Sequence, residues 1–159
     1  MIDGPYFALT VLGVLGTALV AGVFCAFSTF VMRGLAALPP ARGVAAMNGI
    51  NVAAVRPPFM IVFLGSAVVC AVIAVVTFVV WPERGAVELV VGSVLYLAGS
   101  FAVTRAAHVP RNDVLLGLDP DSEEAAAYWP RYVREWTRWN HIRTVASAAA
   151  AVAYVLALT

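Results

Sequence analysis

Long apolar runs constrain the fold of this chain more than any other feature. Residues 6–32, 59–81 and 87–104 are mostly apolar, and residues 142–158 form a fourth, alanine-rich run. A helix needs about 20 mainly apolar residues to cross a bilayer. The composition, 62% hydrophobic and 12% charged, also lies far from that of soluble domains. We therefore expect an all-α fold, with residues 1–159 forming a single four-helix transmembrane bundle.

The connections between these runs differ in length. A tight turn after Trp81 makes the second and third helices antiparallel neighbours, whereas the first and third connections are long. With four spans, both long loops lie on one membrane face. We expect a short helix around Val44–Val55 in the first connection, and Asp121 or Ser122 as the cap of a helix in the third.

The arginines predict an orientation in the membrane. The long connections and their flanks carry nine of the ten basic residues, and only Arg84 lies in the short loop. Arginine and lysine are enriched on the cytoplasmic side of membrane proteins. We expect a multi-pass protein of the cell membrane, with cytoplasmic long loops and both termini extracytoplasmic. The net charge of +1 gives no reason to expect a nucleic-acid partner.

Small residues within the apolar runs bear on packing. Gly92 and Gly99 are among those whose spacing lets helices approach closely, although such spacing is common in an alanine-rich chain. Cys25 and Cys70 have no spacing typical of a disulfide framework or a zinc site. We expect both to be buried as small apolar side chains.

The densest polar chemistry lies where the last helix enters its apolar tail. At about 100° per residue, one face of that helix carries Trp129, Tyr132, Trp136, Asn140, Arg143 and Ser147. Arg131, Arg134 and Arg138 lie nearly opposite and are expected to face solvent or phosphate groups. His141 projects away from the tryptophan face.

Two interpretations of this aromatic face remain open. The first is an interfacial aromatic belt with arginine reaching the headgroups. The second is a pocket for a flat aromatic ligand, which would stack on tryptophan and accept charge-assisted hydrogen bonds from arginine. Asn140 and Arg143 favour the pocket, because a belt does not need an asparagine on that face.

A second polar stripe follows the loop end of the third helix. Its members recur every four residues and are Tyr96, Ser100, Thr104 and His108. Asn112 follows shortly, and Asn51 and Arg56 precede the second span. These segments all reach one membrane face, so a pocket shared between them is geometrically possible.

The first and third helices share a weak internal sequence repeat. Ser28 precedes Arg33 by five positions, and Ser100 precedes Arg105 by five. A duplicated helix pair and coincidence both account for it.

A metal or haem centre has little support in the sequence. His108 and His141 are the two histidines, and neither belongs to a His-x-x-x-His or Glu-x-x-His pair. We expect no metal site and no cofactor. The chain also lacks a Ser-His-Asp motif and a glycine-rich phosphate loop.

At these residues the chain resembles the small four-helix membrane proteins of the anthrone oxygenase type. The resemblance covers nearly the whole chain, and its most specific block runs from Trp136 to Thr144. The other positions that carry it are Phe27, Ser28, Val31, Met32, Leu35, Ala46, Met47, Ile50, Asn51, Thr104, Val109, Pro110, Asn112, Asp113, Trp129 and Tyr132. The chain departs from the family pattern at His108, where an asparagine is expected, and at Arg111, where an apolar residue is usual.

The resemblance implies that O2 oxidises a polycyclic anthrone to an anthraquinone without an obvious cofactor. Such a reaction needs a base, a stabiliser for the enolate oxygens and a dry aromatic slot. The candidate catalytic residues are His141, His108 and Arg143. The candidate substrate-binding residues are Asn51, Arg56, Asn112, Trp129, Tyr132, Trp136, Trp139 and Asn140. The alternative is a non-catalytic membrane protein that binds a quinone, pigment or lipid, or supports a partner complex; the oligomeric state is open.

Overall fold

The computed structural model describes residues 4–159, which form helices and turns with no strand. Short π-helical turns continue two of the α-helices, so the described part of the chain makes five continuous helical rods. In chain order their segments are α1 Gly4–Ala26, η1 Phe27–Val31 and α2 Met32–Ala36; α3 Pro40–Ala54; α4 Pro57–Val80; α5 Ala86–Tyr96, η2 Leu97–Ala102, η3 Thr104–His108 and α6 Val109–Leu116; and α7 Glu123–Ala157. The all-α prediction is confirmed.

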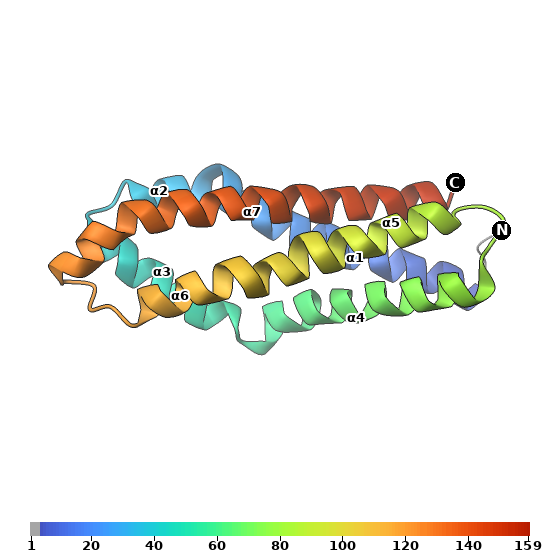
Figure 1. The fold of residues 1–159 in the computed structure, drawn as a ribbon, viewed down its shortest axis with the longest axis horizontal. Helices are drawn as coiled ribbons and strands as arrows, with labels where there is room; N and C mark the ends of the chain where they lie inside the picture. Colours follow the sequence, from blue (N-terminus) through green and yellow to red (C-terminus); the bar gives the residue numbers. More distant parts are fainter. Residues whose placement is uncertain (1–3) are drawn as a thin grey trace.

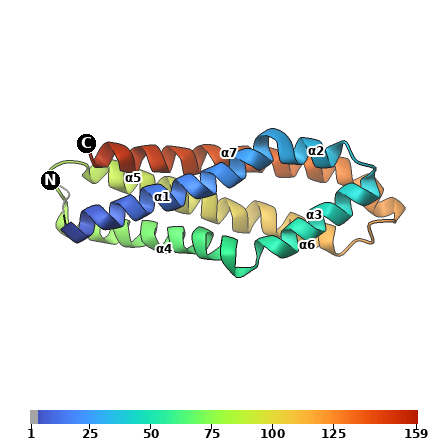
Figure 2. The same cartoon turned by 180° about the vertical axis from the view of Figure 1, so that it is seen from behind.

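The rods lie lengthwise against one another (Figure 1). Helix α7 packs along α1 and α5, and α4 packs against the same two helices. The start of α1 and the end of α7 lie at one end of the molecule, and α2, α3, α6 and the start of α7 lie at the other (Figure 2). We call these the terminal end and the loop end.

Within residues 4–159, three helices are long and apolar enough to cross a membrane, namely Gly4–Ala36, Pro57–Val80 and Ala86–Leu116. They contain the first three expected spans, apart from one residue at the end of the second. The fourth expected span lies in α7, which is not among the three. The membrane character of the chain is therefore supported, whereas a bundle of four spans remains a proposal.

The third helix is longer than the sequence analysis expects. Residues 105–116 continue it as η3 and α6, whereas the sequence prediction ended the third span at residue 104 and assigned this segment to the third connection. Pro110 lies in the first turn of α6, directly after a π-helical turn. Proline lacks an N–H, so it is tolerated where the hydrogen-bond ladder changes pattern.

Local signals set the other helix boundaries. The short helix expected around Val44–Val55 is α3, which starts earlier because Pro40 is favourable in a first turn. The Ser122 Oγ atom accepts a hydrogen bond of 3.1 Å from the N–H of Ala125 and so caps α7. Glu123 and Glu124 then lie in the first turn, where negative charge is favourable.

The terminal end is closely packed around Tyr154 of α7. A Cβ atom on Gly92 would lie 2.8 Å from Cε1 of this ring, and one on Gly13 would lie 3.1 Å from Cε2. The buried Tyr154 hydroxyl shares a 2.9 Å hydrogen bond with Ser93 Oγ. Glycine thus permits the approach of α1 and α5 to α7. Cys70 is buried nearby as expected, whereas Cys25 is exposed because its side of α1 faces outward.

Candidate functional site

A cavity of about 610 Å³ lies toward the loop end of the molecule. Residues of α1, η1, α3, α4, η2, η3, α6 and α7 line it. Its polar lining includes Asn51, His108, Asn112 and Arg143. Its apolar walls include Phe24, Phe27, Met47, Ile50, Phe59, Phe63, Phe101 and Trp136. The cavity therefore combines a few polar groups with a mainly aromatic and aliphatic wall, as ligand pockets commonly do.

Arg143 is the principal charge of this cavity, and it is only 5% exposed. Its Nη1 donates to Thr104 Oγ1 at 3.0 Å, and its Nη2 donates to Asn140 Oδ1 at 2.7 Å. Within residues 4–159, no carboxylate pairs with this guanidinium. Its Cζ lies 4.0 Å from the ring centroid of Phe24 and 5.2 Å from that of Trp136. Aromatic faces attract a cation but do not neutralise it.

Asn140 holds Arg143 rather than lining the cavity. Its Nδ2 donates to the Phe24 carbonyl oxygen at 2.7 Å and to Ser28 Oγ at 2.8 Å. Ser28 in turn shares a 3.0 Å hydrogen bond with Thr144 Oγ1. Asn140 is fully buried, so its amide links α1 to α7 and leaves its oxygen to accept from the guanidinium.

Two π-helical turns near Arg143 carry the two serines of the weak internal repeat. Ser28 lies in η1 and contacts Asn140, and Ser100 lies in η2 and accepts a 3.0 Å hydrogen bond from Ser147. Single π-helical turns occur frequently at functional sites. Both serine segments therefore contact the polar stretch of α7, one at Asn140 and the other at Ser147.

Besides Arg143, the cavity is lined by the exposed Arg105 and by His108, which is only 1% exposed. Its ring meets Trp136 edge to face, with centroids 4.8 Å apart. Neither Nδ1 nor Nε2 has a hydrogen-bond partner among the described residues. A buried imidazole without partners is costly, so its nitrogens are suited to a polar group of a bound molecule.

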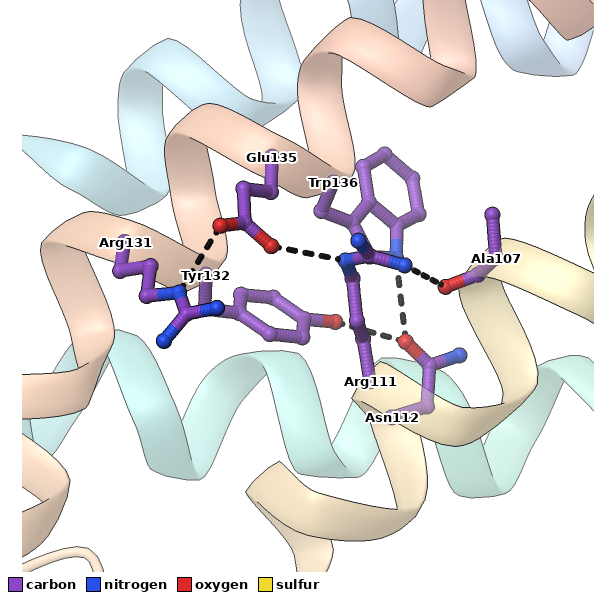
Figure 3. A network of polar contacts seen from close by, with 7 residues as sticks. All are labelled: Ala107, Arg111, Asn112, Arg131, Tyr132, Glu135 and Trp136. Atoms are coloured by element: carbon purple, nitrogen blue, oxygen red, sulfur yellow. Dashed lines mark hydrogen bonds and ion pairs between the residues drawn. The ribbon is translucent and has the colours of Figure 1, made fainter.

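Asn112 fixes two aromatic side chains of α7 at the cavity edge. Its Oδ1 accepts hydrogen bonds from the Tyr132 hydroxyl at 2.8 Å and from Trp136 Nε1 at 3.0 Å (Figure 3). Burial raises the pKa of the Tyr132 hydroxyl above its ordinary value, so Tyr132 stays a donor. Trp136 is thereby oriented between His108 and Arg143.

Arg111 belongs to a separate ionic network beside Asn112. Its Nε pairs with Glu135 Oε2 at 3.1 Å, and its Nη1 donates to the Ala107 carbonyl at 2.7 Å (Figure 3). Arg131 reaches the other oxygen of Glu135 at 2.8 Å. Its hydrogen bond lowers the pKa of Glu135, with Arg111 contributing in the same direction. This network ties α6 to α7 outside the cavity.

Three cavity residues carry buried nitrogens that no described side chain or backbone group satisfies. They are Nδ2 of Asn51, both ring nitrogens of His108, and Nε of Arg143. The amide and guanidinium nitrogens are donors, and the imidazole is a donor or an acceptor. The cavity can thus bind an oxygen anion beside a group that accepts a proton.

The structure brings together only part of the predicted site. All six residues of the predicted face of α7 are buried, but only Trp136 and Arg143 of them line the cavity. Trp129 stacks on Tyr132 with centroids 5.7 Å apart and packs over Gly43, farther toward the loop end. These two aromatic rings close the loop end rather than wall the cavity.

Three other predicted site residues lie outside the cavity. Trp139 is 37% exposed, and Arg56 is exposed at the start of α4. His141 is exposed on another side of α7, where it lines a separate groove. The last helix turns by about 100° per residue, so residues adjacent to a buried one face elsewhere. His141 is therefore poorly positioned as a base for this cavity.

Phe24 is the residue that the sequence analysis missed. Its carbonyl holds Asn140, and its ring lies under the guanidinium of Arg143. It lies inside an apolar run, so nothing in the sequence separates it from a lipid-facing phenylalanine. No group of three His, Cys, Asp or Glu side chains that could hold a metal ion occurs within residues 4–159.

Comparison with known proteins gives a family match for residues 59–153. This segment matches the family model described as anthrone oxygenase, and it contains His108, Asn112, Trp136 and Arg143. No curated protein and no solved structure gives a significant match. The matched segment spans more than half of the sequence, so the chain belongs to the anthrone oxygenase family, as the resemblance predicted. The match does not include residues 1–58, to which the resemblance also extended.

Proposed function

We propose that this protein is a membrane-embedded oxygenase that oxidises a polycyclic aromatic substrate of the anthrone type with O2 in the cavity beside His108 and Arg143. The observation that carries the proposal is the guanidinium of Arg143, buried in an apolar cavity without a carboxylate among residues 4–159. Burying a cation costs several kcal/mol unless it is compensated. A substrate that becomes an anion during the reaction supplies that compensation when it is needed.

The substrate class follows from the shape and chemistry of the cavity. A volume of about 610 Å³ accommodates several fused rings. Phe24, Phe27 and Trp136 offer aromatic surfaces for a flat molecule. Asn51 and Arg143 offer unused donors to the oxygen of a ketone or phenol. An anthrone has such an oxygen and, across the ring, an acidic CH2 group.

His108 is the candidate base. It takes a proton from the CH2 group, and the resulting enolate places its charge on the oxygen beside Arg143. The enolate passes one electron to O2, and the radical pair combines to a peroxide at the same carbon. Protonation and loss of water then convert this carbon to a carbonyl. The overall change is CH2 plus O2 to C=O plus H2O, so electrons and atoms balance without another reductant.

We further propose that the second half of α7 is a fourth membrane span. Its outward face is apolar, with exposed side chains at Val145, Val152 and Val155. Both long connections would then lie on the cytoplasmic face, because nine of the ten arginines lie in or beside them and only Arg84 lies in the short loop on the other side. A reporter that is active only in the cytoplasm should stay silent at the C-terminus; activity there would refute this orientation.

The activity test uses the purified protein in detergent with an anthrone under air. We expect stoichiometric O2 uptake and the appearance of quinone absorbance well above the rate without protein. Chelator treatment should leave the rate unchanged, and loss that one metal restores would refute the cofactor-free reaction. Anthrone binding without turnover would instead support a non-catalytic binding protein.

A further inference from the structure

A second hollow of about 340 Å³ lies between α2 and α7 and shares no lining residue with the cavity. We call it the arginine groove. Its basic side chains, all exposed, are Arg33, Arg134, Arg138 and His141. Met32, Ala36 and Val133 form its apolar part. A cationic rim above an apolar base is typical of a surface that receives an amphipathic anion.

The charges of the arginine groove are not compensated by the protein. No acidic residue lines it, and its three arginines make no ion pair within residues 4–159. The nearest comparable arginine in sequence, Arg131, pairs with Glu135 instead. The groove is therefore a local concentration of positive charge available to an external anion.

Both walls of the groove contribute to this charge. Arg134, Arg138 and His141 recur at intervals of four and three residues, which brings them onto one face of α7. Arg33 comes from α2, across the groove. The Thr137 Oγ1 atom between them is buried and has no hydrogen-bond partner among the described residues. A bound oxygen anion would meet cations from two helices and a hydroxyl donor.

The position of the groove relates it to the membrane boundary. Arg33 follows directly after the first apolar run, and His141 directly precedes the last one. Ile142 and Val145, which are exposed, continue the Arg138 face toward the terminal end. With residues 142–158 as the fourth span proposed above, on which this inference rests, lipid headgroups would lie at this level and acyl chains beneath them.

We propose that the arginine groove binds the headgroup of an anionic phospholipid. The phosphate lies among the arginines, and the acyl chains lie along the apolar face that begins at Ile142. Basic pockets between helices near the cytoplasmic surface bind such headgroups in other membrane proteins. This site is independent of turnover in the cavity, because the two share no lining residue.

The test titrates the detergent-solubilised full chain with phosphatidylglycerol or phosphatidylcholine and counts bound lipids by native mass spectrometry. We expect the wild type to prefer phosphatidylglycerol. The variant with Arg33→Gln and Arg138→Gln, one from each wall, should lose about twenty-fivefold in affinity, about fivefold for each charge. The variant with Arg33→Lys and Arg138→Lys should keep most of the preference, since it keeps the charges.

The control variant carries Arg42→Gln and Arg84→Gln, two exposed arginines outside the groove that remove the same charge. It should bind phosphatidylglycerol as the wild type does. Equal losses in both glutamine variants, or no lipid preference in the wild type, would overturn the proposal. Displacement of phosphatidylglycerol by millimolar inorganic phosphate would show that the groove takes a soluble anion rather than a lipid.

Discussion

The two ends of the molecule treat buried polar groups differently. At the terminal end they are paired: Tyr154 with Ser93 at 2.9 Å, and Thr17 with the Gly13 carbonyl at 2.7 Å. The buried side-chain atoms without partners in residues 4–159 belong to loop-end residues, which are Asn48, Asn51, His108, Trp129, Thr137 and Arg143. The terminal end pairs its buried polar groups within the protein, whereas the loop end leaves buried donors and acceptors available to a bound molecule.

This difference suggests a division of roles, in which the terminal end contributes to the stability of the fold and the cavity contributes to activity. An unsatisfied buried polar group costs about 1–3 kcal/mol, so a stretch selected only for stability would replace it. At the terminal end, substitutions should change stability and leave the chemistry alone. At the cavity, substitutions should change the chemistry with little loss of stability. The following predictions test this division, beginning with the largest expected effect.

His108→Ala should give the largest effect. Removal of the base should lower kcat/KM for anthrone oxidation by about 10²–10⁴-fold. The thermal midpoint Tm should stay the same or rise, because the variant removes two unpartnered buried nitrogens. Both quantities are measured on the same preparation.

The comparison variant is His141→Ala, which changes the exposed histidine outside the cavity. Its loss of kcat/KM should be much smaller than that of His108→Ala. The reverse ranking would make His141 the base, and a large fall in Tm for His108→Ala would contradict the division between the two ends.

Arg143→Lys should lower kcat/KM by about 10²–10³-fold, the range for loss of one group that stabilises an oxyanion. Lysine keeps the charge, but its ammonium cannot reproduce the planar fork that contacts Thr104 and Asn140. Arg42→Lys, at an exposed position of α3, is the control and should keep the wild-type rate. An active Arg143→Lys enzyme would show that charge alone suffices.

The sequence predicted the helices more fully than the site. Apolar runs identify three helices long enough to span a bilayer, because the bilayer thickness sets the length required. Helical spacing correctly identifies the buried face of α7. The continuation of the third helix through Pro110 was not predictable from proline preferences alone. It depends on the π-helical turn η3, which has no recognisable sequence signal.

The site was only partly predictable for a related reason. Five of the predicted site residues do line the cavity, namely Asn51, His108, Asn112, Trp136 and Arg143. Their side chains are polar or bulky within an apolar sequence, so the sequence alone indicates them. Ordinary helical spacing already placed His141 away from the tryptophan face, because α7 contains no π-helical turn. The direction of His108 is harder to predict, because His108 ends η3, where the period departs from 3.6 residues. Phe24 contributes a backbone carbonyl, and any residue type has one.

Gly92→Val tests the terminal end. A Cβ at this position would lie 2.8 Å from Tyr154 Cε1 and 3.2 Å from the Ala150 carbonyl oxygen. We expect a loss of about 1–3 kcal/mol in the free energy of unfolding, the usual result of overpacking. Gly22→Val is the matched control, because a Cβ there meets nothing within 4 Å. Activity per folded molecule should be unchanged; a fall would couple the terminal end to the cavity.

Glu135→Gln should have the smallest effect, because this ion pair is at the surface. Arg131 and Arg111 lower the pKa of Glu135 in the folded chain, so the carboxylate stabilises the fold above its unfolded pKa of about 4.3. This contribution disappears as pH falls through the lowered folded pKa. The variant should therefore melt about 1–3 °C below the wild type at pH 7 and together with it near pH 3.

Glu83→Gln, an exposed carboxylate without an ion pair in the described chain, should show no such pH-dependent difference. A Glu135→Gln deficit that persists at pH 3 would mean that packing between α6 and α7, rather than charge, links these helices beside the cavity.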